Sequence, residues 1–168
     1  MIPDRTYRAL LIANSQFPED PHELQQLVGP PHDVEVLRVA LTAPSIGMFH
    51  RDDVQQIVEA SRTEIEKALE NCANTAGEND TLFVYYSGHG VVDAHGRFYI
   101  ASRDTSTHLL ASTSISADTI NAILTKGYAR NVILVLDCCH SGAYAFKGST
   151  IPETLRGGGY HLLASSTR

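Results

Sequence analysis

The sequence predicts an α/β protein with a doubly wound, mostly parallel sheet. Strand-like apolar runs alternate along the chain with segments whose apolar residues recur every three or four positions, which is typical of helices packed on a sheet. The strongest run, residues 132–136 (VILVL), is unbroken and rich in β-branched residues. A strand buried on both faces has this composition, so the run is expected near the centre of the sheet.

The first part of the chain predicts a central strand, a loop and a helix. Residues 7–14 form the strand, because their second half is continuously apolar. Residues 15–31 hold four prolines and read as a loop. A helix is expected over residues 33–42, where apolar residues fall on one face and Asp33 is a candidate N-cap.

A second strand and helix follow a turn over residues 43–49. The strand is expected over residues 53–58. Ser61-Arg62-Thr63-Glu64 matches a capping box, and the helix that it begins should end near Gly77. Cys72 lies on the apolar stripe of this helix, so we expect it to be a buried core residue.

In the second half of the chain, the sequence predicts three more strands, a hairpin and a helix. One strand covers residues 81–86 and breaks into Ser87-Gly88-His89-Gly90, and residues 91–101 form a hairpin with its turn at residues 93–96. Ser116 should cap a helix that stops at Gly127. The strand that ends at Asp137 comes next, residues 143–159 read as irregular, and residues 160–164 form a last strand.

Composition bounds the kind of protein. The chain has 168 residues, of which 43% are hydrophobic and 19% charged, which suits a single domain with a sizeable core. No apolar run is long enough to span a membrane and the N-terminus lacks a signal-peptide pattern, so a cytoplasmic protein without a membrane partner is expected. The net charge of -6 argues against a nucleic-acid partner. Three cysteines, two of them adjacent, do not make a disulfide framework.

Reactive residues follow the ends of two predicted strands. Asp137-Cys138-Cys139-His140-Ser141-Gly142 follows one, and His89 with its flanking glycines follows the other. If the two strands are parallel neighbours, His89 and the cysteine pair meet across one crevice, as a thiol nucleophile and its base require. His89 and Cys139 are 50 residues apart, and the N–H groups of Gly90 and Cys139 are candidates for an oxyanion hole.

Other interpretations of these residues stay open at this stage. Cys138, Cys139, His140 and His89 could ligate zinc, although adjacent cysteines strain a tetrahedral site, and we expect no metal. One cysteine could be packed under the strand end, which suits Cys138 because neighbours along a strand point to opposite faces. The remaining candidates, His95, His108 and His161, read as surface or packing residues.

The motifs YSGHG at residues 86–90 and DCCHSG at residues 137–142 resemble those of the caspase-like cysteine peptidases of clan CD, in particular the metacaspase and bacterial orthocaspase branch. The resemblance implies a caspase-like three-layer sandwich in which residues 1–168 form the larger, p20-like catalytic half. The C-terminal p10-like part is expected to be absent from this chain. No cofactor is required by these motifs, although calcium activation occurs in related proteins.

Carried over residue by residue, the resemblance implies that Cys139 is the nucleophile and His89 the general base. It also implies an acidic S1 pocket formed by Asp33 and Asp137. Residues 27–35 (LVGPPHDVE) keep only Gly29 and Asp33 of the family motif that precedes the first helix, so the role of Asp33 competes with that of a helix N-cap. Asp137 lies two residues before Cys139 and therefore on the same side of an extended segment.

These residues predict a cysteine endopeptidase that cleaves protein or peptide substrates after arginine or lysine. The alternative is a catalytically silent caspase-like module that scaffolds a partner. A zinc or redox site at the cysteine pair is a third interpretation. Arg168 is a candidate processing site, because an arginine-specific peptidase would leave arginine at a new C-terminus, and a released p10-like fragment would then be a partner.

Overall fold

A computed structural model describes residues 6–140 and 160–165 of the chain. Its strands are β1 (Tyr7–Ala13), β2 (Val54–Val58), β3 (Thr81–Val92), β4 (Phe98–Ile100), β5 (Ile115–Ser116), β6 (Asn131–His140) and β7 (Tyr160–Ser165). Its helices are α1 (Pro30–Leu41), α2 (Arg62–Thr75), α3 (Leu110–Thr113) and α4 (Ala117–Lys126), with short 3-10 turns at Arg51–Asp53 and Thr107–Leu109.

Five parallel strands form the main part of the sheet, in the order β2-β1-β3-β6-β7. β3 pairs with β6 over residues 81–90, and on its other edge it pairs with β1 over residues 81–87. Beyond β1, β3 continues and pairs antiparallel with β4 over residues 90–92, and β4 pairs with β5. The predicted α/β fold with a mixed, mostly parallel sheet is therefore confirmed.

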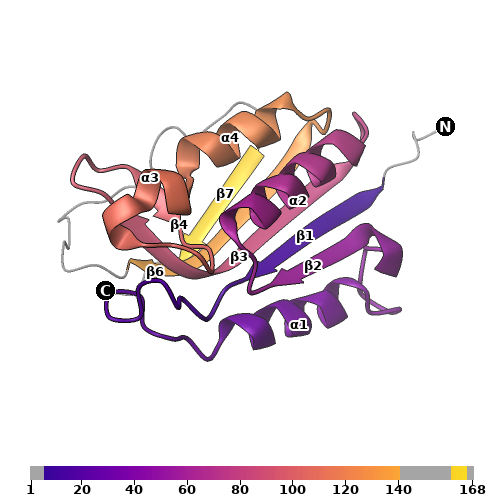
Figure 1. Cartoon of the computed structure of the whole chain (residues 1–168). Coiled ribbons are helices and arrows are strands. Elements are labelled where there is room, and N and C mark those ends of the chain that lie inside the picture. The colour runs from indigo at the N-terminus through magenta and orange to yellow at the C-terminus, as the bar shows by residue number, and fades with distance from the viewer. Residues whose placement is uncertain (1–5, 141–159, 166–168) are drawn as a thin grey trace.

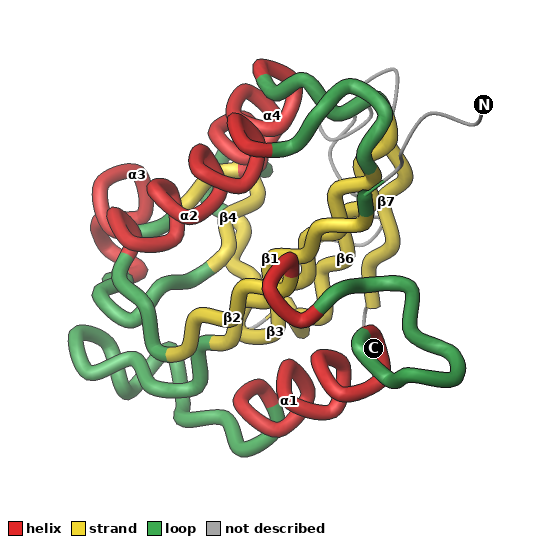
Figure 2. The backbone as a smooth tube through the Cα atoms, turned by 90° about the vertical axis from the view of Figure 1, so that its right-hand side faces the viewer, coloured by secondary structure: helices red, strands yellow, loops and turns green. Residues whose placement is uncertain are grey.

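Helices cover both faces of the sheet and make three layers (Figures 1 and 2). α2 and α4 lie on one face, over a core that includes Leu82, Val84 and Tyr86 of β3. α1 lies on the other face, where Val34 packs with Ala9 and Leu11 of β1 and with Tyr85. Alternate residues of β3 thus serve the two layers, as the two-residue period of a strand requires.

Several elements form as their local sequence predicts. The capping box of Ser61 and Glu64 begins α2, and Ser116 caps α4 by accepting a hydrogen bond from the Thr119 N–H. The hairpin between β3 and β4 turns at residues 93–96, where Gly96 has φ +79°. Cys72 is buried in the core, and its burial raises the pKa of the thiol to about 11.

Three predicted boundaries were wrong. α1 begins at Pro30 with Gly29 as its N-cap, so Asp33 lies in the first turn and is not the cap. Proline is favoured at the first helical position because its missing N–H has no intrahelical partner there. β3 and β6 run past their predicted ends to Val92 and His140. They pair with each other as far as Gly90 and His140, and the last residues of β3 pair with β4 across the hairpin.

Among residues 6–140 and 160–165, no helix has the length and apolar character that a bilayer crossing requires. The segment 143–159, which was predicted to be irregular, lies outside the described residues.

Candidate active site

His89 lies within β3, on the face of the sheet that α1 covers. His89 is only 6% exposed, and its ring packs against the ring of Phe17 with a centroid distance of 4.9 Å. Phe17 belongs to the loop between β1 and α1 and forms a small core with Leu24 and Val91. The histidine therefore does not follow a strand end, as the sequence predicted, but is held inside a strand that continues to Val92.

The hydrogen bonding of His89 fixes its tautomer. Nε2 lies 2.7 Å from the backbone carbonyl of Gln25, and a carbonyl can only accept, so Nε2 carries the hydrogen. In the neutral ring Nδ1 is then an acceptor, and this buried nitrogen has no hydrogen-bond partner among the described residues. Such an atom is available to take a proton from a nearby group.

Burial lowers the pKa of His89 below its usual value, because it disfavours the charged imidazolium. The hydrogen bond to the Gln25 carbonyl acts in the opposite direction without reversing the shift. His89 is therefore held mainly as a neutral ring at neutral pH, which is the form that a general base needs.

The segment that carries Gln25 is tied at three points to residues that follow β2 and β4. The side-chain amide of Asn14 donates to the Ala60 carbonyl at 2.8 Å, and the Ala60 N–H donates back to Asn14 Oδ1 at 3.1 Å. The Glu59 carboxylate accepts hydrogen bonds from the N–H groups of Ser15 and Gln16 and from the Ser15 hydroxyl.

The third tie joins this segment to the loop after β4. Asp20 accepts hydrogen bonds from both the backbone N–H and the hydroxyl of Thr107. These hydrogen bonds, led by that of the Thr107 side chain, lower the pKa of Asp20 although burial opposes them. The three ties hold the Gln25 carbonyl against His89 from a loop that has no regular secondary structure of its own.

The glycines beside His89 are required by packing on the opposite face of β3. A Cβ atom at Gly88 would lie 2.3 Å from the Tyr86 hydroxyl, and one at Gly90 would lie 2.8 Å from the Phe98 ring. The Tyr86 hydroxyl in turn is within hydrogen-bonding distance of the His89 and Ala101 carbonyls, at 2.9 and 2.7 Å. The flanking glycines thus let tyrosine and phenylalanine rings close over the back of the strand.

The two adjacent cysteines occupy different positions relative to His89. Cys138 is 4% exposed and belongs to the core under α2 and α4, where its sulfur would lie 3.0 Å from a Cβ at Gly90. Cys138 and His89 are therefore on opposite faces of the sheet and cannot ligate one metal ion. Cys139 is the register partner of His89 in the parallel pairing of β3 and β6.

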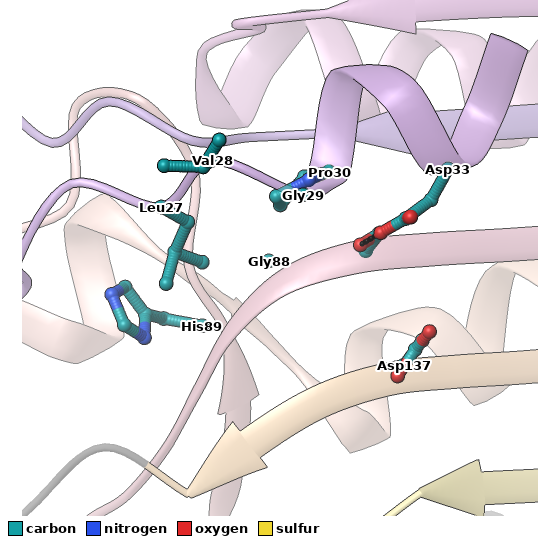
Figure 3. A pocket seen from close by; sticks show the side chains of 9 residues that line it. Leu27, Val28, Gly29, Pro30, Asp33, Gly88, His89 and Asp137 are labelled. Atoms are coloured by element: carbon teal, nitrogen blue, oxygen red, sulfur yellow. Dashed lines mark hydrogen bonds between the residues drawn. The ribbon is translucent and has the colours of Figure 1, made fainter.

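A pocket of about 220 Å³ opens between α1, β3 and β6 on the His89 face (Figure 3). It brings together three residues that the sequence singled out, Asp33, His89 and Asp137. The two carboxylates lie toward one end and the His89 ring toward the other (Figure 3). The rest of its lining is apolar or small: Leu27, Val28, Gly29, Pro30, Ser87 and Gly88.

Each carboxylate accepts a hydrogen bond from a hydroxyl group of β3. The Ser87 hydroxyl donates to Asp33 Oδ2 at 3.1 Å, and the Tyr85 hydroxyl donates to Asp137 Oδ2 at the same distance. Neither lysine nor arginine is among the described lining residues, so the pocket is acidic at the end where the two carboxylates lie. It has the charge that binds a guanidinium or an ammonium group.

Sequence reasoning missed two contributors to this site. The Gln25 carbonyl is a backbone atom, which leaves no mark in the amino-acid sequence. Tyr85 was read only as a strand residue, although its place two residues before Ser87 puts it on the same face of β3. Arg168 lies outside the described residues, and among those described no three His, Cys, Asp or Glu side chains form a metal-binding group.

Comparisons with known proteins agree with this architecture. The family model of the Caspase domain matches residues 6–165. A crystal structure of a protein from Geobacter sulfurreducens superposes with a TM-score of 0.62 at 23% identity, over 82% of this chain and 52% of the other. This chain thus spans about half the length of that protein. No curated protein matches the sequence.

Proposed function

Because the chain belongs to the caspase-domain family, we propose that it is a cysteine endopeptidase of the metacaspase and orthocaspase branch that cleaves after arginine or lysine. The observation that carries this proposal is the pocket that Asp33, Asp137 and His89 line together, where the buried Nδ1 of His89 has no partner among the described residues. The YSGHG and DCCHSG motifs supply the branch.

The proposed reaction proceeds through an acyl-enzyme. The Cys139 thiol gives its proton to Nδ1 of His89, and the sulfur attacks the carbonyl carbon of the scissile bond. The resulting oxyanion is stabilised by the N–H groups of Gly90 and Cys139. His89 then protonates the leaving amine as the C–N bond breaks, and a water molecule hydrolyses the thioester with His89 as base.

The specificity follows from charge. Hydrogen bonds between a guanidinium and carboxylates contribute about 1.5–3 kcal/mol each, so two carboxylates contribute roughly 3–6 kcal/mol. At about 1.4 kcal/mol per tenfold, this separates an arginine at P1 from a neutral residue by about 10² to 10⁴ in kcat/KM. An aspartate at P1, which animal caspases prefer, would be repelled by the same pair.

A set of peptides that differ only at P1 tests this proposal. The protein should cleave after arginine and lysine far faster than after leucine or aspartate, and Asp137→Asn should reduce that preference. Cys139→Ala should abolish cleavage, whereas Cys138→Ala, a matched loss of a thiol on the opposite face, should retain most of it. Equal rates after leucine and arginine would contradict the acidic pocket, and full activity of Cys139→Ala would contradict the nucleophile.

A further inference from the structure

Asp137 carries one of the two pocket charges from an exposed position on β6. The orientation of such a carboxylate depends on the groups that donate hydrogen bonds to it. The Tyr85 hydroxyl lies 3.1 Å from Asp137 Oδ2 and donates a hydrogen bond to it. This contact links β3 to β6 beside the pocket that Asp137 lines, between residues 52 positions apart.

The other end of Tyr85 is fixed in the core. The residue is 8% exposed, and its ring packs with Ala9, Leu11 and Val34 between the sheet and α1. The hydroxyl therefore projects from a buried ring that has only two rotatable side-chain bonds, so it holds Asp137 at little cost in conformational entropy.

The surroundings keep Tyr85 a hydrogen-bond donor. Burial raises its pKa, and the negative charges of Asp137 and Asp33 raise it further, so the phenol is protonated at neutral pH. The hydroxyl can only donate to a carboxylate oxygen, which leaves the negative charge of Asp137 in place and fixes the plane of its carboxyl group.

We propose that Tyr85 is a positioning residue for substrate specificity, which orients the Asp137 carboxylate toward the guanidinium of a P1 arginine. The proposal rests on the cleavage after basic residues proposed above. Tyr85 touches neither the scissile bond nor His89 in this role. Its removal should weaken recognition of the P1 side chain and leave the chemistry at Cys139 intact.

Tyr85→Phe tests the proposal, with Tyr99→Phe as a matched control. Tyr99 also donates its hydroxyl to a carboxylate, Asp93 Oδ2 at 3.3 Å, but in the hairpin away from the pocket. Tyr85→Phe should lower kcat/KM for an arginine substrate about tenfold, mainly through KM, because a hydrogen bond to a charged group is lost. Its kcat/KM for a leucine substrate should not change, and Tyr99→Phe should behave as wild type.

A double-mutant cycle separates positioning from a general loss of structure. In the Asp137→Asn protein, Tyr85→Phe should have no further effect on the ratio of arginine to leucine cleavage. Thermal unfolding of each variant checks that it is folded. An unchanged or raised ratio in Tyr85→Phe alone, or the same drop in the Asp137→Asn background, would overturn the proposal.

A binding measurement keeps this proposal distinct from the proposed function. Titration of acetyl-arginine amide into the Cys139→Ala protein reads the pocket without turnover. Adding Tyr85→Phe should weaken this binding about tenfold, with Tyr99→Phe unchanged. If the wild type cleaves no peptide, the proposed function fails, and the titration alone decides the role of Tyr85: equal binding with and without the hydroxyl, or no binding at all, overturns it.

Discussion

At the scale of single residues, His89 shows how burial keeps an imidazole ring neutral. Its ring is enclosed by Phe17 and bonded to the Gln25 carbonyl, and burial is the larger influence on its pKa, which is lowered from the usual 6.5. The unfolded chain binds a proton more readily than the folded protein. Folding stability from this residue is therefore fully present above pH 6.5 and declines as the pH falls below it.

We expect the acid limb of kcat/KM to lie below pH 6.5, because the free enzyme keeps His89 neutral there. Phe17→Ala, which exposes the His89 ring to water, should move this limb to higher pH. Phe49→Ala removes a ring that packs on Tyr7 and Phe83 instead, and should leave the limb in place. The measurement is a pH profile of arginine-peptide cleavage. A limb above pH 6.5 in the wild type would contradict the buried neutral base.

Gly88 is constrained by the ring behind it. An added methyl group would approach the Tyr86 hydroxyl to 2.3 Å and the Asn14 carbonyl to 3.0 Å, so the substitution must displace buried groups. Gly88→Ala should lower the free energy of unfolding by about 1–3 kcal/mol. Gly77→Ala, whose nearest contact would be an ordinary 3.4 Å, is the matched control in denaturant titrations. Equal stability of the two variants would argue against the packing role.

At the scale of elements, the segment from Asn14 to Gly29 has a structure set by its ties rather than by helix or strand. The Glu59 carboxylate accepts hydrogen bonds from the first residues of this segment. The backbone of Glu59 is in the left-handed region at φ +53°, which is unfavourable for a residue with a side chain. A backbone conformation of this kind persists only where surrounding contacts compensate for it. The three hydrogen bonds from Ser15 and Gln16 are such contacts.

Substitutions at Glu59 should separate the hydrogen bonds from the backbone conformation. Glu59→Ala and Glu59→Gly both remove the carboxylate, and both should reduce cleavage severalfold by loosening the Gln25 segment. A glycine variant is usually less stable than the alanine variant by about 0.4–1 kcal/mol in the free energy of unfolding. At a residue in the left-handed region, the two variants should be equally stable or the glycine variant more stable. Denaturant unfolding measures the stability of the two variants, with Glu70→Ala at an exposed position of α2 as a control. A glycine variant less stable than the alanine one would contradict the argument.

The elements also show what sequence reasoning can reach. Capping boxes and buried strands are local signals, so the start of α2, the cap of α4 and the strand leading to Asp137 were predicted. The extension of β3 through His89 was not, because the strand that pairs with it there, β6, is distant in the sequence. The prolines before Asp33 were read as loop residues, although the same residues favour the first turn of a helix.

At the scale of the whole molecule, β6 belongs both to the pocket and to the main core. It lies between β3 and β7, and its alternate residues Leu134, Leu136 and Cys138 enter the core under α2 and α4. The strand that bears Asp137 and Cys139 is thus also a strand on which the global stability depends.

Leu134→Ala should therefore destabilise the entire domain. The side chain is 1% exposed, and emptying such a site costs about 2–5 kcal/mol. Leu163→Ala removes the same atoms from a 60% exposed position on the neighbouring β7 and should change stability by less than about 0.5 kcal/mol. Denaturant unfolding followed by circular dichroism compares the two. If Leu134→Ala lowered the free energy of unfolding only slightly, the core around β6 would be loosely packed.

β1 ends at Ala13, and β3 takes β4 as its new neighbour only from Gly90 onward. Gly88 and His89 therefore lie where this edge of β3 pairs with neither β1 nor β4. The chain that leaves β1 passes this part of the edge, and its Gln25 carbonyl contacts His89 there. Had β1 been two residues longer, it would have continued along β3 and carried that segment away. The surroundings of this histidine are thus decided by the length of a neighbouring strand that contributes no side chain to the pocket.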